Sequence, residues 1–185
     1  MPSIDNAKIV IVATDGFEQS ELTTPQKQLA EAGATVHVAS PDGSNIKGWD
    51  KDHWGDETKA DLKIEDIDVA TYDAMVLPGG QINPDVLRAD ADVVQKIKDF
   101  AATGKTLAAI CHAPWLLIEA DLVRGKRLTS YNSIRTDLKN AGAEVVDEEV
   151  AQDGNLITSR NPGDLDAFCK TIVEAVSASR DKAAA

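Results

Sequence analysis

The chain has 185 residues, of which 43% are apolar and 27% charged, a composition typical of one folded domain rather than of a disordered chain. Its 31 acidic residues outnumber 19 basic ones and give a net charge of −12 at pH 7. A field of that sign repels phosphate groups, so the composition argues against nucleic acid and anionic membranes as partners.

The chain has two cysteines, Cys111 and Cys169, and no CxxC motif. Neither a disulfide framework nor a zinc knuckle is therefore expected. No apolar stretch approaches the roughly 20 residues that span a bilayer, and the first residues, Met1 to Asp5, lack the basic and apolar regions of a secretory signal. We expect free thiols in the reducing cytoplasm.

Strand-like and helix-like segments alternate along the first part of the chain. Continuous apolar, β-branched runs predict buried strands over residues 8–13, 35–39, 74–77 and 106–110. Apolar residues at helical spacing, followed by a glycine, predict helices over residues 19–32 and 92–103. Residues 45–59 read as a loop or a small hairpin. The alternation predicts an α/β fold with a mostly parallel sheet.

The last third of the chain adds shorter elements. The pattern predicts a helix over 133–140, then two short strands around Val145 and Leu156, joined by a turn at Asp153-Gly154, and an amphipathic helix over 164–176. No repeat or linker divides the chain. We expect one domain over residues 7–177 and a frayed tail over 178–185.

Cys111 lies where a predicted strand ends and a predicted helix begins. Such a strand–turn–helix junction holds a nucleophile in a strained backbone conformation and needs small residues on either side, here Ala109 and Ala113. Pro114 suits the first turn of a helix. The positive end of the helix dipole is expected to lower the pKa of the thiol. Cys169, inside the last amphipathic helix, is expected to pack in the core.

Residues 109–117 (AICHAPWLL) resemble the nucleophile elbow of the DJ-1/PfpI superfamily, in particular its PfpI-like branch. Ala113 stands where that family often has glycine. Further resemblances follow in the expected order over nearly the whole chain: 14–22 (TDGFEQSEL), 48–56 (GWDKDHWGD), 77–80 (LPGG), 128–131 (LTSY) and 158–162 (TSRNP). The resemblance implies a flavodoxin-like three-layer sandwich around the central sheet.

The resemblance places the Glu18 carboxyl beside the sulfur of Cys111. An ionised carboxylate there would repel a thiolate, whereas a protonated one would donate a hydrogen bond to it. We therefore predict a protonated Glu18 and a Cys111 of low pKa. Without the resemblance, Glu18 would be read as a carboxylate that accepts hydrogen bonds from a helix N-terminus.

Gly79 and Gly80 end the third predicted strand, where glycines let the backbone approach a ligand closely. Their N–H groups, with that of His112, are predicted to form an oxyanion hole. The alternative is a simple tight turn.

His112 follows the cysteine directly, and neighbouring residues on a helix do not face each other, so the sequence does not by itself make it the base for Cys111. The resemblance implies that an acidic residue of a neighbouring subunit, here Asp85, orients His112 as a proton shuttle. Asp85 could equally be an acidic residue at a helix start, after Pro84.

The remaining motifs exclude several classes of protein. His37 lies between valines of a strand and is expected to be structural, whereas His53 is either solvated or at a pocket mouth. No histidine follows His112, which excludes class I glutaminases and papain-like proteases. No metal-ligand spacing and no nucleotide-binding glycine motif is present, so no cofactor is expected.

The resemblance implies a cysteine-dependent stress-response enzyme of glyoxalase or deglycase type, whose substrate is a small reactive carbonyl or a glycated protein. Two alternatives stay open: an intracellular cysteine peptidase, and a redox sensor or holdase-like chaperone that works through oxidation of Cys111. Trp49, Trp54 and Trp115 could narrow the pocket and so favour a small substrate. The resemblance also implies a homodimer or hexamer with the site near an interface.

Overall fold

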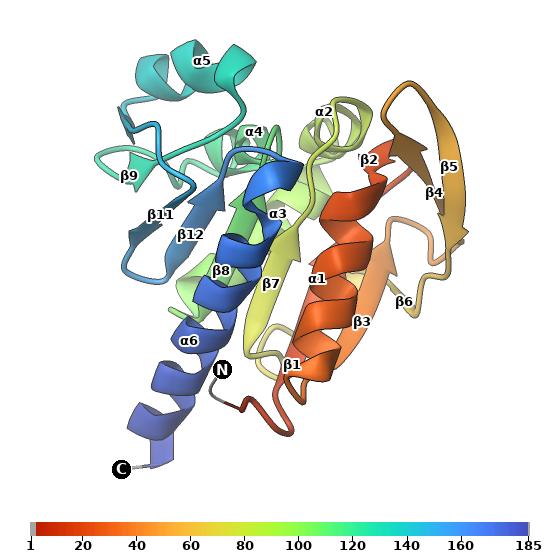
Figure 1. Ribbon diagram of the computed structural model, residues 1–185, viewed down its shortest axis with the longest axis vertical. Helices are drawn as coiled ribbons and strands as arrows, with labels where there is room; N and C mark the ends of the chain where they lie inside the picture. The colour runs from red at the N-terminus through yellow and green to blue at the C-terminus, as the bar shows by residue number, and fades with distance from the viewer. Residues whose placement is uncertain (1–2, 185) are drawn as a thin grey trace.

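The structure is a computed structural model that describes residues 3–184 (Figure 1). A seven-stranded sheet with the order β11-β12-β8-β7-β1-β3-β6 forms its centre. Neighbouring strands are parallel except for the β11–β12 pair. The strands of this sheet are β1 (Lys8–Val12), β3 (Thr35–Ser40), β6 (Leu62–Lys63), β7 (Ala74–Leu77), β8 (Thr106–Ile110), β11 (Val150–Asp153) and β12 (Leu156–Ser159).

Helices cover both faces of the sheet. They are α1 (Gln19–Glu31), α2 (Ile82–Arg88), α3 (Ala91–Ala102), α4 (Pro114–Glu119), α5 (Arg135–Asn140) and α6 (Leu165–Ala184), with short 3-10 turns η1 (Ile64–Asp66), η2 (Asn132–Ile134) and η3 (Pro162–Asp164). Figure 1 shows α1 and α6 side by side in front of the sheet. The predicted three-layer α/β fold is confirmed.

The continuous apolar strands follow from burial on two faces. In β1, Val10 and Val12 pack in one core cluster with residues of α3 and α4, whereas Ile9 and Ile11 pack in a second cluster with residues of α1 and α6. Because side chains alternate along a strand, a strand between two helical layers needs apolar residues at every position. This is why β1 shows no alternation between polar and apolar residues.

Two small sheets flank the centre. β2 (Phe17–Glu18) pairs with β4 (Ile46–Asp50), which forms a hairpin with β5 (His53–Thr58), so the 45–59 segment is a hairpin rather than a loop. The strand near Val145 is β10 (Glu144–Val145), and it pairs with β9 (Arg127–Leu128). The Asp153-Gly154 turn instead joins β11 to β12.

The last helix continues to Ala184, beyond the end near residue 176 that the apolar pattern predicted, so residues 178–184 belong to this helix. Ala185 lies outside the described residues. The guanidinium of Arg180, within this segment, donates a hydrogen bond to Asp73 Oδ2 at 3.2 Å. Among the described helices, none is long and apolar enough to cross a membrane.

Candidate active site at the end of strand β8

Cys111 occupies a sharp turn between β8 and α4. Its φ of 65° lies in the left-handed region, which a residue other than glycine adopts only at a cost in free energy. Ala109 and Ala113, on either side, are completely buried, and Pro114 is the first residue of α4. A strand–turn–helix junction with Cys111 at its left-handed turn is therefore present in the backbone.

The left-handed turn brings two consecutive side chains together. The Sγ atom of Cys111 lies 3.2 Å from Nδ1 of His112. Neighbouring side chains diverge in a regular helix or strand, and the contact forms here because Cys111 is in neither. His112 is thus within hydrogen-bonding distance of the thiol, a contact that the residue spacing alone did not predict.

Three other side chains fix the His112 ring. Its Nε2 lies 3.1 Å from Ser133 Oγ. The Tyr131 ring stacks on it with centroids 4.7 Å apart, and the edge of Trp115 packs against it at 5.2 Å. Burial lowers the pKa of His112. The imidazole is therefore neutral near pH 7 and can accept a proton.

Glu21, and not Glu18, is the carboxyl group next to the thiol, so the sequence-based assignment to Glu18 is wrong. Glu18 immediately precedes α1, and its Oε1 accepts a hydrogen bond from Ser20 Oγ at 3.3 Å. Glu21 is fully buried in the first turn of α1, and its carboxyl lies beside the Cys111 side chain: a Cβ atom on Gly79 would be within 2.7 Å of both Glu21 Oε2 and Cys111 Cβ. Burial raises the pKa of Glu21 to about 8. The predicted protonated carboxyl is thus supplied three positions later in the chain.

The sequence contained a signal for Glu21. Glu21, Leu22, Pro25 and Leu29 are the buried residues of α1, at the spacing that places them on one side of a helix. A carboxyl group within such a buried stripe requires a specific partner. Because Glu18 lies before the first helical turn, it is outside that stripe.

The thiol of Cys111 has a raised rather than a lowered pKa. Burial raises the pKa of Cys111 first, and the charge on the Glu21 carboxylate raises it further. The backbone N–H groups of Gly80 and His112 act in the opposite direction and lower the pKa. The predicted low pKa is therefore wrong, since the desolvation of a cysteine residue only 5% exposed outweighs these donors.

The two glycines of the turn after β7 have different partners. The N–H of Gly79 donates to Glu21 Oε2 at 2.8 Å and so is not free to bind a developing oxyanion. The N–H groups of Gly80 and His112 act to lower the pKa of the Cys111 thiol. Of the three predicted oxyanion-hole donors, Gly79 is therefore engaged by the carboxyl group, whereas Gly80 and His112 stay predictions.

Asp85 does not contact His112 within the chain, where the partner of Nε2 is Ser133. It lies on α2 and lines a cavity of about 360 Å³ together with Gln81, Ile82, Val86 and Trp115. A second cavity, of about 560 Å³, lies on the Tyr131 side of His112 and is also lined by Asn132, Arg135, Asp147, Arg160 and Asn161. Each of the two aromatic neighbours of His112, Tyr131 and Trp115, therefore lines a cavity.

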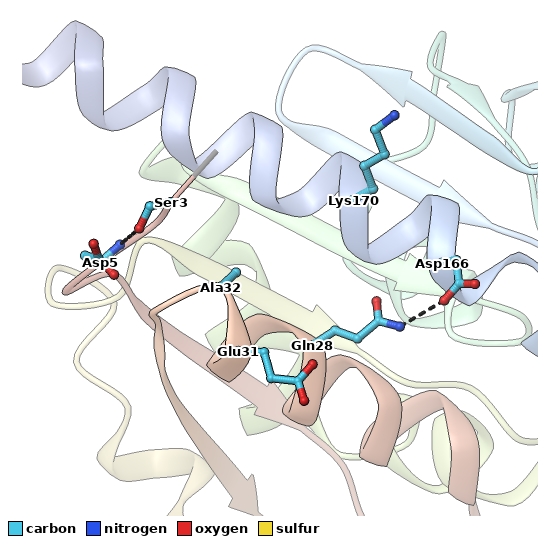
Figure 2. Close-up of a pocket in the computed structure, with 7 residues that line it drawn as sticks. All are labelled: Ser3, Asp5, Gln28, Glu31, Ala32, Asp166 and Lys170. Atoms are coloured by element: carbon cyan, nitrogen blue, oxygen red, sulfur yellow. Dashed lines mark hydrogen bonds between the residues drawn. The ribbon is translucent and has the colours of Figure 1, made fainter. Parts of the chain in front are cut away.

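Another cavity, of about 610 Å³, lies away from the thiol (Figure 2). Figure 2 shows Gln28 of α1 reaching across to Asp166 of α6, with a hydrogen bond of 2.9 Å. The other lining residues are Ser3, Asp5, Glu31, Ala32 and Lys170. Because no cysteine or histidine is among these lining residues, we assign the candidate site to the turn at Cys111.

The other histidines lie outside the site. His37 is paired with the hydroxyl of Tyr72 at 2.9 Å, as expected of a structural residue. The exposed His53 contacts Asp52 at 2.8 Å in the β4–β5 hairpin. In residues 3–184, no group of three His, Cys, Asp or Glu side chains is placed to hold a metal ion.

Two of the three tryptophans lie in the β4–β5 hairpin, and the third packs against His112. Trp49 and Trp54 pack against each other edge to face, with ring centroids 5.4 Å apart. Trp115 alone borders a cavity beside His112. Cys169 is 1% exposed within the core cluster that contains α1 and α6, as predicted.

Comparisons with known proteins give one family. The sequence model of the DJ-1/PfpI family matches residues 7–175. A protein of Thermococcus kodakarensis named as a deglycase is 41% identical over 90% of this chain and 98% of its own length. The protein/nucleic acid deglycase 2 of Escherichia coli is 42% identical over 87% of this chain and 92% of its own.

A solved structure agrees with these sequence matches. Drosophila melanogaster DJ-1beta superposes with a TM-score of 0.84 and is 31% identical, with 92% of this chain and 90% of that chain covered. The family match spans β1 to α6 and therefore includes every element that positions Cys111, His112 and Glu21. The chain belongs to the DJ-1/PfpI family.

Proposed function

We propose that the protein is a cysteine-dependent enzyme of deglycase type. Its substrates are reactive dicarbonyls such as methylglyoxal and the early adducts that these compounds form with protein amines. The observation that carries the proposal is the 3.2 Å contact between Cys111 Sγ and His112 Nδ1. A thiol whose pKa is raised needs a base at the moment of attack, and a neutral imidazole at this distance can accept its proton.

In the first step, Cys111 gives its proton to His112 and the sulfur attacks the carbon that carries the amine in the adduct. A C–S bond forms, the C–N bond breaks, and the amine leaves with the proton that His112 returns. With the free dicarbonyl, the sulfur adds to the aldehyde carbon and the proton goes to its oxygen. Both routes give the same hemithioacetal on Cys111.

The hemithioacetal then isomerises to a thioester. A proton leaves the carbon that bears sulfur and another is delivered to the neighbouring carbonyl carbon, through an enediol. One carbon is oxidised and its neighbour is reduced, so no external oxidant or reductant is needed. Water hydrolyses the thioester to a hydroxy acid and the free thiol. We assign to the N–H groups of Gly80 and His112 the stabilisation of the oxyanions of these steps.

The burial of the nucleophile favours a small substrate over a peptide backbone. Cys111 is 5% exposed and His112 is 8% exposed. A dicarbonyl, or an adduct at the end of a long side chain, can enter such a site. A scissile amide continues on both sides into polypeptide and needs an open groove. The peptidase alternative lacks an observation of this kind. The sensor alternative requires an ionised thiol, which the raised pKa of Cys111 disfavours.

The deglycase names of the relatives support the proposal. The name of the Escherichia coli relative includes nucleic acid, so the argument against nucleic acid from net charge has no support among the relatives. For this chain, glycated protein amines and glycated nucleobases are both substrates to be tested. Free cysteines fit a reducing cytoplasm, which we propose as the location.

The proposed assembly is a homodimer or hexamer, as the family resemblance implies. Two apolar side chains of α2 support a second copy near the site: Ile82 is 40% exposed and Val86 is 51% exposed, and both line the cavity beside Trp115. Asp85 lies between them in the sequence and would be placed at such an interface. Light scattering measures the assembly size, and a monomer with full activity would refute this part of the proposal.

The test of the function uses a lysine peptide freshly modified with methylglyoxal. We expect the wild-type protein to release the free amine together with lactate, and Cys111→Ser to release neither above the uncatalysed rate. Cys169→Ala is the matched control and should retain activity because that thiol lies in the core. Equal release by Cys111→Ser and the wild type would overturn the proposal. A parallel arm with a methylglyoxal-modified guanosine tests the nucleic-acid substrate.

A further inference from the structure

Asn83 is a fully buried polar residue in the first turn of α2, and the proposed mechanism does not use it. Its Oδ1 accepts the backbone N–H of Thr14 at 2.8 Å. Its Nδ2 donates to the carbonyl oxygens of Pro78 at 2.9 Å and of Gly79 at 3.2 Å. Thr14 follows β1, whereas Pro78 and Gly79 follow β7, the neighbouring strand. One side chain therefore joins the ends of two strands beside the site.

The two carbonyls that Asn83 binds belong to consecutive peptide units. Both units are trans, and in a trans unit the C=O and N–H groups point in opposite directions. The unit that begins with Pro78 C=O ends with the N–H of Gly79, which donates to Glu21 Oε2 at 2.8 Å. The unit that begins with Gly79 C=O ends with the N–H of Gly80, one of the groups that lower the pKa of the thiol. Asn83 therefore binds the carbonyl ends of both units whose N–H groups act on the carboxyl or the thiol.

We propose that Asn83 is a positioning residue for the site. By holding the two carbonyls of the turn after β7, its amide directs the N–H groups of Gly79 and Gly80 toward the carboxyl and the thiol. A hydrogen bond to the carbonyl of a peptide unit also polarises that unit and strengthens its N–H as a donor. The inference rests on the proposed role of Cys111 in catalysis, but the hydrogen bonds of Asn83 and the titration of the thiol are measured without any activity.

The partners of the Asn83 side chain determine the orientation of its amide. If Nδ2 and Oδ1 were exchanged, the NH2 group would face the N–H of Thr14, and the oxygen would face two other carbonyl oxygens. A primary amide combines two N–H donors with an acceptor and carries no charge, which is what these three partners require. Because all three hydrogen bonds lie within the chain and the residue is fully buried, a second copy would neither add to them nor replace them.

The first test is made on the wild-type protein by hydrogen exchange with NMR detection. The side-chain NH2 protons of Asn83 should exchange with solvent far more slowly than those of Asn132, an exposed asparagine. Asn83→Ala should speed the exchange of the backbone N–H groups of Gly79 and Gly80. If the side chain of Asn83 exchanges as fast as that of Asn132, the proposal is overturned, because an amide without partners cannot hold the turn.

The second test measures the alkylation of Cys111 by iodoacetamide as a function of pH, in a Glu21→Gln background so that no carboxylate titrates beside the thiol. Asn83→Ala removes no charge, and we expect it to raise the apparent pKa of the thiol by about 0.5–1 pH unit, because the N–H of Gly80 is no longer held. Asn83→Leu fills the volume but cannot donate, so it should raise the pKa by the same amount. Leu87→Ala, at a buried position of the same helix, is the matched control: it creates a cavity and should leave the profile unchanged.

The kinetic arm measures kcat and KM for amine release, with Glu21 intact. We expect Asn83→Ala to lower kcat by about 2–10-fold with an unchanged KM, because the oxyanion donor assigned to Gly80 is no longer held in place. The proposal is overturned if Asn83→Ala leaves both the thiol profile and kcat unchanged, or if Leu87→Ala changes the profile as much as Asn83→Ala does. If the wild type has no deglycase activity, the proposed function fails, but hydrogen exchange and alkylation still decide the role of Asn83.

Discussion

Glu21 Oε2 accepts the backbone N–H of Gly79 at 2.8 Å, and this hydrogen bond ties helix α1 to the glycine turn beside the thiol. Glu21 Oε1 is buried and has no hydrogen-bond partner among the described residues. A Cβ atom on Gly79 would lie 2.6 Å from Glu21 Oε2 and 2.7 Å from the Cβ of Cys111. The absence of a side chain at Gly79 therefore allows the carboxyl and the thiol to meet.

The Glu21 carboxyl is expected to make stability depend on pH. Its pKa is raised by burial from 4.5 to about 8, so its contribution to stability is fully present below the unfolded pKa and is lost as pH rises through the folded pKa. Glu21→Gln keeps the shape and removes the titration. The unfolding free energy of the wild type, relative to Glu21→Gln, should fall between these two pH values by up to about 1.4 kcal/mol per pH unit.

Urea unfolding of both proteins across this pH range provides the measurement. The difference between the two free energies isolates Glu21 from the other titrating groups. A difference that stays constant from the unfolded to the folded pKa would show that the carboxyl is not protonated in the folded state.

The same substitution should make the Cys111 thiol easier to ionise. The charge on the Glu21 carboxylate raises the pKa of Cys111, and Gln carries no charge. Alkylation of Cys111 by iodoacetamide, followed by peptide mass spectrometry as a function of pH, should give a lower apparent pKa in Glu21→Gln than in the wild type. Cys169, whose pKa burial and then Asp166 raise to about 12, is the internal reference. An unchanged profile for Cys111 would mean that the two groups do not interact.

Removal of the imidazole should affect the chemical step. We expect His112→Gln to lower kcat for amine release by roughly 10²–10⁴-fold, the usual contribution of a general base. His53→Gln is the control, because that ring is exposed on the β4–β5 hairpin. Comparable kcat values for His112→Gln and the wild type would show that another group accepts the thiol proton.

Gly80 and Gly104 form a matched pair for testing the turn beside the sulfur. Both have positive φ values, of 79° and 72°. A Cβ at Gly80 would meet the backbone at Gly16 O and Glu18 N, 2.5 and 2.6 Å away, whereas one at Gly104 meets nothing within 4 Å. Gly104→Ala should cost about 1–2 kcal/mol of unfolding free energy, and Gly80→Ala about 2–5 kcal/mol.

Denaturant unfolding measures both values. The contact at Gly80 is with backbone rather than with a flexible side chain, so it cannot relax without moving the β2 segment. Equal losses in the two variants would indicate that the turn after β7 accommodates a side chain, contrary to the packing described above.

The fold was predictable because its signals are local. β1 and β8 are continuous apolar runs, and α3 carries Val93, Val94, Ile97 and Phe100 on its buried side. The elbow at Cys111 was predictable for the same reason, since a strand, two small residues and a proline stand next to each other in the sequence. In such patterns the type of each residue indicates whether that residue is buried.

The partners of the thiol were harder to predict because they depend on long-range contacts. The predicted start of α1 at Gln19 agrees with the structure, but the sequence does not show which side of the helix faces the sulfur, and this decides between Glu18 and Glu21. Ser133 reaches His112 from 21 residues away. The pKa of Cys111 could not be inferred from the helix dipole, because burial acts in the opposite direction and is larger.

The central claim is that the Cys111 sulfur forms the covalent intermediate. Acid quenching during turnover of methylglyoxal-modified peptide, followed by digestion and mass spectrometry, locates the three-carbon adduct directly. We expect the adduct on the peptide that contains Cys111, rising and then decaying as lactate accumulates, with the peptide of Cys169 unmodified. Lactate production with no adduct on Cys111 at any time, or with the adduct on Cys169, would contradict the account.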